Sequence, residues 1–225
     1  MPNNQTPSSI KISPSDLTYL YHSCKRCFYL KYKYKISQPG FSGGINSTLD
    51  SLFKNYFNHK SISTFIKNTT QQGIIIETGR TISSKTISHP GKMDCYLEGK
   101  YDALIEFDDQ TYGVVDFKAS KYSQGKEETY KRQLQAYQYA FLHPQNGQQR
   151  QISKIGLLFL YPNNLQDSQN SLSMSLTQHW IEILYDENDF LTFIHEVQDL
   201  LSSPKTPPPT KDCPYCKFVS ETSNL

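Results

Sequence analysis

Apolar residues recur at helical spacing in several separate parts of the chain. The segment "SPSDLTYL" has the pattern of a helix start, with Ser13 at the N-cap, Pro14 at the first helical position and Asp16 in the first turn. Aromatic and apolar positions continue this helix to Tyr34. The same periodicity predicts further helices over residues 45–58, 62–68, 127–142 and 187–202.

Between these helices, the pattern changes to strands. Residues 97–107 alternate between two faces, which predicts one strand with an apolar side and a mostly polar side. "DDQT" is a turn, and "YGVVDFKAS" at 112–120 returns as the hairpin partner. Side chains repeat every two residues in a strand, so Asp116 and Lys118 point the same way. If the two strands pair, Asp102, Asp116 and Lys118 converge at one place on the sheet.

Two later segments complete the predicted sheet. "ISKIGLLFLYP" at 152–162 has the continuous apolar character of a strand covered on both faces, and "WIEILYD" at 180–186 is a further strand. A strand, a helix and a strand in succession imply a crossover connection. The expected fold class is therefore α/β, with a mixed central sheet flanked by helices.

Length and composition favour one main domain. The 225 residues are 36% hydrophobic, enough for a single core. Residues 1–12 are polar and are expected to be a disordered tail, residues 13–202 form the domain, and residues 203–225 form a proline-rich linker with a terminal cysteine pair. No signal peptide or membrane span is evident, which indicates a cytoplasmic protein with no membrane partner. The net charge of +2 gives no argument for nucleic acid.

Four of the five cysteines form two CxxC pairs near opposite ends of the chain, "CKRC" at Cys24 and Cys27 and "CPYC" at Cys213 and Cys216. In a reducing compartment, two such pairs favour a four-thiolate metal site over disulfides. The alternative is that the first pair is two helix positions and the second a tail turn. Zinc and an iron–sulfur cluster both accept thiolate ligands, and the spacing does not separate them.

A basic stretch follows the first cysteine pair. Five lysine and arginine residues between 25 and 35 alternate with aromatic residues, and no acidic residue occurs between Asp16 and Asp50. Such a surface can track a phosphate backbone. A solvated helix face with inward-packed tyrosines explains the same pattern equally well.

The two acids and the lysine suggest metal-dependent chemistry. Two carboxylates beside a water-accessible cleft form an oxygen-ligand site suited to Mg²⁺ or Mn²⁺. A neighbouring lysine can orient water and offset charge that develops on phosphorus, as phosphodiester hydrolysis requires. An ordinary surface ion pair is the alternative for Asp116 and Lys118. Val114 and Val115 argue against it, because they place the pair close to a buried layer.

The ordered series "GKYDALIEF", "VVDFKAS" and "QLQAY" resembles the PD-(D/E)XK nuclease superfamily, in particular its RecB-like branch with the CRISPR-associated iron–sulfur nucleases. The resemblance covers roughly residues 13–217. It implies a restriction-endonuclease-like core in which Asp102 and Asp116 bind the metal, Phe117 lends its carbonyl, Lys118 is the catalytic lysine, and Gln133 with Tyr137 supports the site. It also implies that the four paired cysteines hold an iron–sulfur cluster, which joins the C-terminal tail to the N-terminal helix.

Two features depart from that branch. Its members usually carry a metal-binding histidine on the helix before the sheet, where this chain has Asn46 or Asp50, with His59 later. Asp50 is the better replacement, because a carboxylate remains a hard ligand. The relatives also commonly have one cysteine in the N-terminal part and three in the C-terminal part, whereas this chain has two in each. This difference weakens the case for an iron–sulfur cluster relative to zinc.

Three hypotheses about the function are compatible with the sequence. The leading one is a metal-dependent nuclease that hydrolyses DNA, and the choice of DNA rests on the resemblance alone. The second is a catalytically inactive nucleic-acid-binding or scaffolding protein that keeps the fold and a structural four-cysteine site. The third is a zinc-stapled protein-interaction module whose acidic strand is an ordinary surface.

Overall fold

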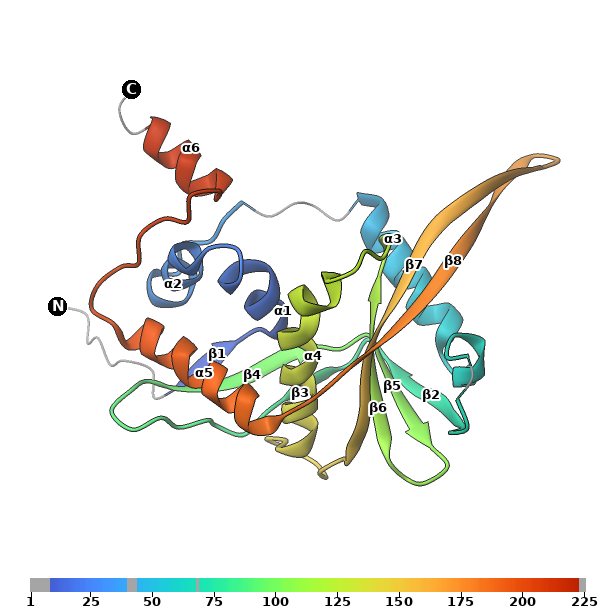
Figure 1. Ribbon diagram of the computed structural model, residues 1–225, viewed down its shortest axis with the longest axis horizontal. Coiled ribbons are helices and arrows are strands. Elements are labelled where there is room, and N and C mark those ends of the chain that lie inside the picture. Colours follow the sequence, from blue (N-terminus) through green and yellow to red (C-terminus); the bar gives the residue numbers. More distant parts are fainter. Residues whose placement is uncertain (1–8, 40–43, 68, 223–225) are drawn as a thin grey trace.

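A five-stranded sheet forms the centre of the molecule (Figure 1). The computed structural model describes residues 9–39, 44–67 and 69–222. The strand order is β2-β5-β6-β7-β8. The bounds are β2 Gly73–Thr78, β5 Ala103–Phe107, β6 Tyr112–Lys118, β7 Ile152–Ser168 and β8 Ser171–Ile183. The β5–β6 hairpin is antiparallel, as predicted, and β6 and β7 run parallel on either side of a crossover through helix α4, Lys126–Leu142.

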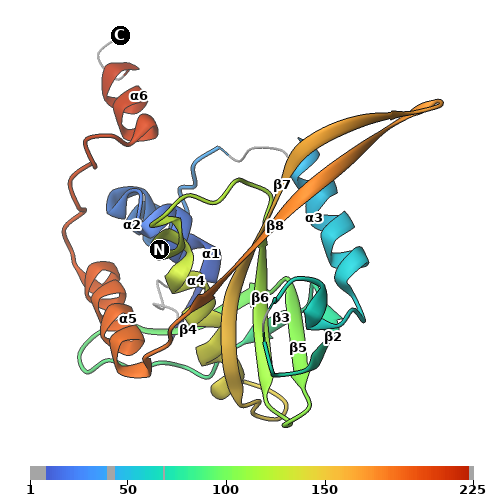
Figure 2. The same ribbon diagram turned by 45° about the vertical axis from the view of Figure 1, so that its right-hand side comes forward.

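A second, smaller sheet lies beside the first (Figure 2). Its order is β1-β4-β3, with β1 Ser9–Ile12, β4 Asp94–Lys100 and β3 Thr81–Ser83. Residues 9–12 were expected to belong to a disordered tail, but they form β1 and pair parallel with β4. The Ile10 and Ile12 side chains are buried, and this burial explains why the segment is ordered. The rest of the predicted tail, residues 1–8, lies outside the described residues.

The helices depart from the sequence prediction in two places. The expected helix over residues 14–34 is divided into α1 Pro14–Asp16, a π-helical turn at Leu17–Tyr21 and α2 Lys25–Tyr34. The helix expected at 62–68 is only a 3₁₀ turn, Ile62–Thr64, and residue 68 lies outside the described residues. The remaining helices are α3 Gly44–Phe57, α5 Glu187–Ser202 and α6 Pro214–Thr222.

The five-stranded sheet is covered on both faces. On one face, Leu134 and Phe141 of α4 pack with buried residues of β5, β6 and β7. On the other face, Phe53 and Phe57 of α3 pack with Ile105 and Phe117. The molecule is therefore a mixed sheet between helical layers, and the predicted α/β class is confirmed.

The alternating run at 97–107 does not form one strand. It breaks at Tyr101 and Asp102, so that β4 belongs to the small sheet and β5 to the large one. Within β5 both faces are buried, and Leu104 is fully inaccessible where the alternation predicted a polar side. Helical layers on both sides of the sheet explain this difference.

Strands β7 and β8 extend beyond the sheet as a two-stranded arm (Figure 1). The pairing of β7 with β6 ends at Phe159, whereas its pairing with β8 continues to the turn at 169–170. The last strand was predicted to begin at Trp180, but it begins at Ser171. At the base of the arm, Gly156 is required because a β-carbon there would lie 2.2 Å from the Trp180 ring.

Candidate active site

The β5–β6 hairpin brings the two predicted acids together. Ala103 pairs with Val115 in the antiparallel register, and Asp102 and Asp116 adjoin this last pair, Asp102 in the bend before β5. The register therefore brings Asp102 next to the end of β6, where its carboxylate contacts the Phe117 backbone N–H, one residue after Asp116.

Asp102 is fixed from two directions. Its Oδ2 accepts a hydrogen bond from the Phe117 backbone N–H at 2.8 Å, and its Oδ1 lies 2.8 Å from Lys54 Nζ. Burial raises the pKa of Asp102 to about 7, and the charge of Asp116 acts in the same direction. Lys54 and the Phe117 N–H oppose this rise. Asp102 is therefore a carboxyl whose ionisation depends on a neighbouring cation.

Asp116 lies at the centre of a buried network. Its Oδ1 accepts a hydrogen bond from Gln133 Nε2 at 2.8 Å. Its Oδ2 is 2.6 Å from Lys118 Nζ, but this contact lies outside hydrogen-bond geometry, so the buried Oδ2 accepts no hydrogen bond. The Asp116 and Lys118 side chains are 4% and 9% exposed. This pair is therefore buried, and the surface ion pair considered from the sequence does not describe it.

Lys118 is surrounded by groups that favour its charged form. Burial alone would lower the pKa of Lys118, but Asp116 and the Tyr19 hydroxyl outweigh burial and raise it. Tyr19 Oη lies 3.2 Å from Lys118 Nζ, and the Tyr130 ring centroid lies 4.2 Å from the same nitrogen. This environment keeps Lys118 a cation at neutral pH.

Helix α3 also contributes side chains to the site. Lys54 Nζ lies 2.6 Å from Asp50 Oδ2, one helical turn earlier, as well as beside Asp102. Asp50 and Asn46 line a cavity of about 300 Å³ that also contacts Lys118. The full lining is Tyr19, Asn46, Asp50, Phe53, Phe117, Lys118, Ala119, Ser120 and Tyr130. His59, the other alternative considered from the sequence, is not among these residues.

Gln133 and Tyr137 of α4 hold different parts of the site. Gln133 contacts Asp116 through Nε2 and accepts a hydrogen bond from Lys118 Nζ at 3.3 Å through Oε1. Tyr137 donates a hydrogen bond to the Lys100 backbone carbonyl at 2.8 Å, just before the bend that carries Asp102. Gln133 thus touches the charged pair, and Tyr137 supports the backbone beside it.

Three residues of the site were missed by the sequence reasoning. Lys54 could have been found from its position four residues after Asp50 on a predicted helix, the spacing that pairs opposite charges. Tyr19 and Tyr130 carry no comparable signal. The π-helical turn at Leu17–Tyr21 and the packing of α4 bring them to Lys118, and neither can be deduced from periodicity.

The donor set fits a divalent metal. Carboxylate oxygens are the ligands that Mg²⁺ and Mn²⁺ prefer. Asp50 lines the cavity, whereas Asp102 and Asp116 are not among its lining residues. Lys54 contacts both Asp50 and Asp102, and the cavity-lining Lys118 contacts Asp116. The buried Asp116 Oδ2 is held by the Lys118 ammonium at 2.6 Å and has no further hydrogen-bond partner among the described residues. Lys54 shows that the space between Asp50 and Asp102 accommodates positive charge.

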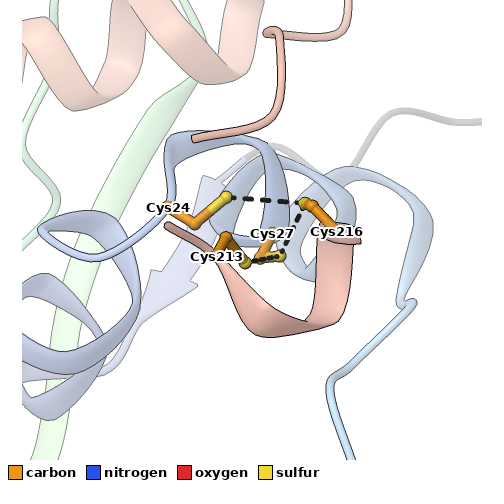
Figure 3. A group of neighbouring side chains, drawn as sticks. All are labelled: Cys24, Cys27, Cys213 and Cys216. Atoms are coloured by element: carbon orange, nitrogen blue, oxygen red, sulfur yellow. Dashed lines mark hydrogen bonds between the residues drawn. The ribbon is translucent and has the colours of Figure 1, made fainter. Parts of the chain in front are cut away.

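The four paired cysteines also meet, although the two pairs are far apart in the sequence (Figure 3). All four sulfur atoms lie within 4.8 Å of one another. Cys27 Sγ is 3.7 Å from the sulfurs of both Cys213 and Cys216, and Cys24 Sγ is 3.8 Å from that of Cys216. The group can hold a metal ion and joins α6 to α2.

The environment of Cys24 suits a thiolate. Burial opposes its ionisation, but hydrogen bonds from Thr210 and Cys27 lower the pKa of Cys24 to about 6. Burial raises the pKa of Cys27 to about 11. A bound cation would be needed to hold Cys27 as a thiolate at neutral pH.

Within the basic stretch at 25–35, Lys25 and Lys35 are exposed, while Arg26 and Lys33 are half-buried and contact other parts of the chain. Arg26 donates to the Pro207 carbonyl, and Lys33 donates to the Leu201 and Ser203 carbonyls at the end of α5. The Tyr29 ring is buried. These contacts fasten the linker to α2 and support the packing explanation for this stretch more than a phosphate-binding surface.

Comparison with known proteins identifies the superfamily. The family model described as "PD-(D/E)XK nuclease superfamily" matches residues 54–220, about three quarters of the chain. The chain belongs to the PD-(D/E)XK nuclease superfamily. The match includes Asp102, Asp116 and Lys118 and begins after Asp50. Membership supports metal-dependent nuclease activity and a nucleic-acid substrate at the level of the superfamily.

The fold also has a counterpart among solved structures. The structure titled "Crystal structure of SSO0001" is similar with a TM-score of 0.54 and 20% identity over 93% of this chain and 84% of that one. This likeness shows the fold alone. The search of curated proteins found no match. Among the described residues, no helix has the length and apolar character needed to cross a membrane.

Proposed function

We propose that this PD-(D/E)XK protein hydrolyses phosphodiester bonds in DNA at the cavity between α3 and β6. The observation that supports this most directly is that Asp102 contacts the Phe117 backbone beside Asp116, with the Lys118 ammonium 2.6 Å from Asp116 Oδ2. This arrangement joins a metal-ligand set to a fixed cation beside a cavity of about 300 Å³. DNA remains an inference from the resemblance of the motifs, and a cytoplasmic location remains an expectation from the sequence.

Each residue of the site has a separate part in this proposal. Asp102 and Asp116 would hold Mg²⁺ or Mn²⁺, with Asp50 as a third carboxylate in place of the usual histidine. The metal, when bound, would neutralise phosphate charge and make bound water more acidic. Lys118 is cationic, so its part is to orient the attacking water and stabilise charge on the phosphate oxygens. Gln133 keeps the Asp116 carboxylate and the Lys118 ammonium in position.

A cleavage assay tests this function. Single-stranded and supercoiled DNA would be incubated with Mn²⁺ and wild-type protein, Asp116→Asn or Lys118→Met. Wild type should cut, and each variant should lose at least about 100-fold in rate, in the range of a general-acid–base or oxyanion-type contribution. Lys154→Met is the control, because it removes a lysine from the exposed Glu182 ion pair away from the site.

The result separates two outcomes. Equal cutting by all four preparations would indicate a contaminating nuclease and contradict the proposal. Absence of cutting with retained gel shifts would favour the second candidate, a catalytically inactive nucleic-acid-binding or scaffolding protein. One observation favours that candidate: the carboxylate that replaces the usual histidine, Asp50, is already bound to Lys54.

We propose zinc as the occupant of the four-cysteine group. With a zinc–sulfur bond of about 2.3 Å, the edges of a tetrahedron are about 3.8 Å. The distances of 3.7 and 3.8 Å that join Cys27 to Cys213 and Cys216, and Cys24 to Cys216, agree with this edge. An iron–sulfur cluster places several iron and sulfide atoms between its ligands and needs a wider set. A single tetrahedral ion therefore fits the geometry best.

A further inference from the structure

Lys54 is not part of any of the sequence motifs that identified the candidate metal ligands. It lies one turn after Asp50 on α3, and its ammonium contacts two carboxylates from different parts of the chain. The distances are 2.6 Å from Nζ to Asp50 Oδ2 and 2.8 Å to Asp102 Oδ1. The Lys54 and Asp102 side chains are 15% and 13% exposed, so water screens this contact weakly.

The two lysines of the site divide the carboxylates between them. Lys54 holds Asp50 and Asp102, while Lys118 holds Asp116. With all five groups ionised, three negative charges face two positive charges. Lys118 contacts Asp116 Oδ2. Lys54 donates a hydrogen bond to Asp50 Oδ2 and also contacts Asp102 Oδ1, whereas the Phe117 N–H binds the other oxygen, Oδ2. Lys54 is thus placed directly between two candidate metal ligands.

We propose that Lys54 is an internal competitor for the divalent ion, and that it sets the metal affinity of the site. This inference rests on the proposed function, because it takes Asp50 and Asp102 to be metal ligands. A divalent ion and an ammonium attract the same carboxylate oxygens and repel each other, so binding the ion requires Lys54 to withdraw from at least one of them. The flexible four-carbon stem of lysine permits this movement.

The competitor role predicts the direction in which removal of Lys54 changes the affinity for the metal. If Lys54 only supported the carboxylates, its removal would loosen them and weaken binding. As a competitor, its removal leaves the carboxylates free and tightens binding. Lys54→Met keeps most of the stem volume and removes the charge. Lys54→Arg keeps the charge and the competition.

Isothermal titration of each folded protein with MnCl₂ measures this directly and requires no cleavage. Lys54→Met should bind Mn²⁺ at least about tenfold more tightly than wild type, a factor that corresponds to about 1.4 kcal/mol. Lys54→Arg should stay within about threefold of wild type. Lys154→Met, which removes a lysine from a distant exposed pair, should also leave the affinity unchanged. Circular dichroism confirms that each variant is folded before titration.

The outcomes separate this inference from the proposed function. Unchanged or weaker Mn²⁺ binding by folded Lys54→Met would overturn the competitor role while leaving the metal site intact. Failure of wild type and Lys54→Met alike to bind Mn²⁺ would overturn both. A second cycle with Asp50→Asn adds a check. The gain from Lys54→Met should become smaller when Asp50 is neutral, because one of the two contested carboxylates is then lost.

Discussion

Gln133 donates a hydrogen bond to the carboxylate of Asp116 at 2.8 Å and accepts one from Lys118 at 3.3 Å, so one amide from α4 aligns both charged groups of β6. Gln133 is itself buried. The helix that crosses over between β6 and β7 therefore does more than connect parallel strands. It determines where the oxygen and the ammonium of the candidate site point.

Replacing Gln133 by Leu should weaken Mn²⁺ binding and DNA cleavage by roughly 10–100-fold, because loss of a supporting contact has effects of this size on metal sites. Titration with MnCl₂ and the cleavage assay measure the two quantities. Gln138→Leu is a matched control, since Gln138 is a buried amide on the same helix that bonds the Ile152 carbonyl instead. A similar loss in both variants would mean that the effect is one of stability.

The buried pair of Asp116 and Lys118 predicts a non-additive effect on stability. Asp116→Ala leaves an ammonium buried without its counter-ion and should lower the free energy of unfolding by about 3–5 kcal/mol. Asp116→Ala combined with Lys118→Met should lose less than Asp116→Ala alone, because no uncompensated charge remains. Urea denaturation measures both. A double variant that is less stable than either single variant would contradict the prediction.

An exposed pair provides the comparison. Neutralising Lys154 and Glu182 together should change the free energy of unfolding by about 0–1 kcal/mol, the usual range for surface ion pairs.

Glu77 gives the protein a defined loss of stability in acid. Burial opposes its ionisation, but hydrogen bonds from Tyr101 and Arg150 outweigh burial and lower the pKa of Glu77 below its ordinary value of 4.5. A group whose pKa is lower in the folded state stabilises the fold above its unfolded pKa. That contribution disappears as the pH falls through the folded pKa. Wild type should therefore be more stable than Glu77→Gln at pH 7, and the difference should shrink below about pH 4.5.

Thermal denaturation of both proteins between pH 7 and pH 3 measures this difference. The Tyr101 hydroxyl donates a hydrogen bond to Glu77 at 2.6 Å, next to the bend that carries Asp102. Titration of Glu77→Gln with MnCl₂ would therefore also test whether that bend affects metal binding. A constant gap between the two proteins across the pH range would show that Glu77 is not the group responsible.

The C-terminal helix depends on the cysteine group. The described residues of α6 include none that is fully buried, so little apolar burial holds this helix to the domain. Removal of the metal with a strong chelator should release α6 and expose the linker at 203–212 to limited proteolysis, while residues before 203 stay intact. Mass spectrometry locates the cuts. Cys95→Ser, which alters the one cysteine outside the group, should leave the linker protected as in wild type.

Metal analysis of the same preparation tests the identity of the ion. One zinc per chain and no visible colour are expected. A brown protein with absorbance near about 400 nm and several iron atoms per chain would instead indicate an iron–sulfur cluster.

The segment 97–120 shows what the sequence predicted correctly and what it missed. Period-two alternation and the "DDQT" turn predicted the antiparallel pairing of β5 and β6, which brings Asp102 beside Phe117 on the strand that carries Asp116 and Lys118. The same alternation concealed the break between β4 and β5, because a strand that passes from one sheet to another keeps its local periodicity. Only the packing of helices on both faces revealed that Leu104 is buried.

The sequence by itself determined the α/β class, the proximity of the acids and the lysine, and the presence of two cysteine pairs, because each of these follows from local spacing. Tertiary structure alone decided that Lys54 lies between Asp50 and Asp102, that Tyr19 and Tyr130 flank Lys118, and that the cysteine sulfurs lie within 4.8 Å of one another. These relationships join segments far apart in the chain. Their geometry depends on how helices pack and where a loop returns, and no local pattern of hydrophobic and polar residues records either.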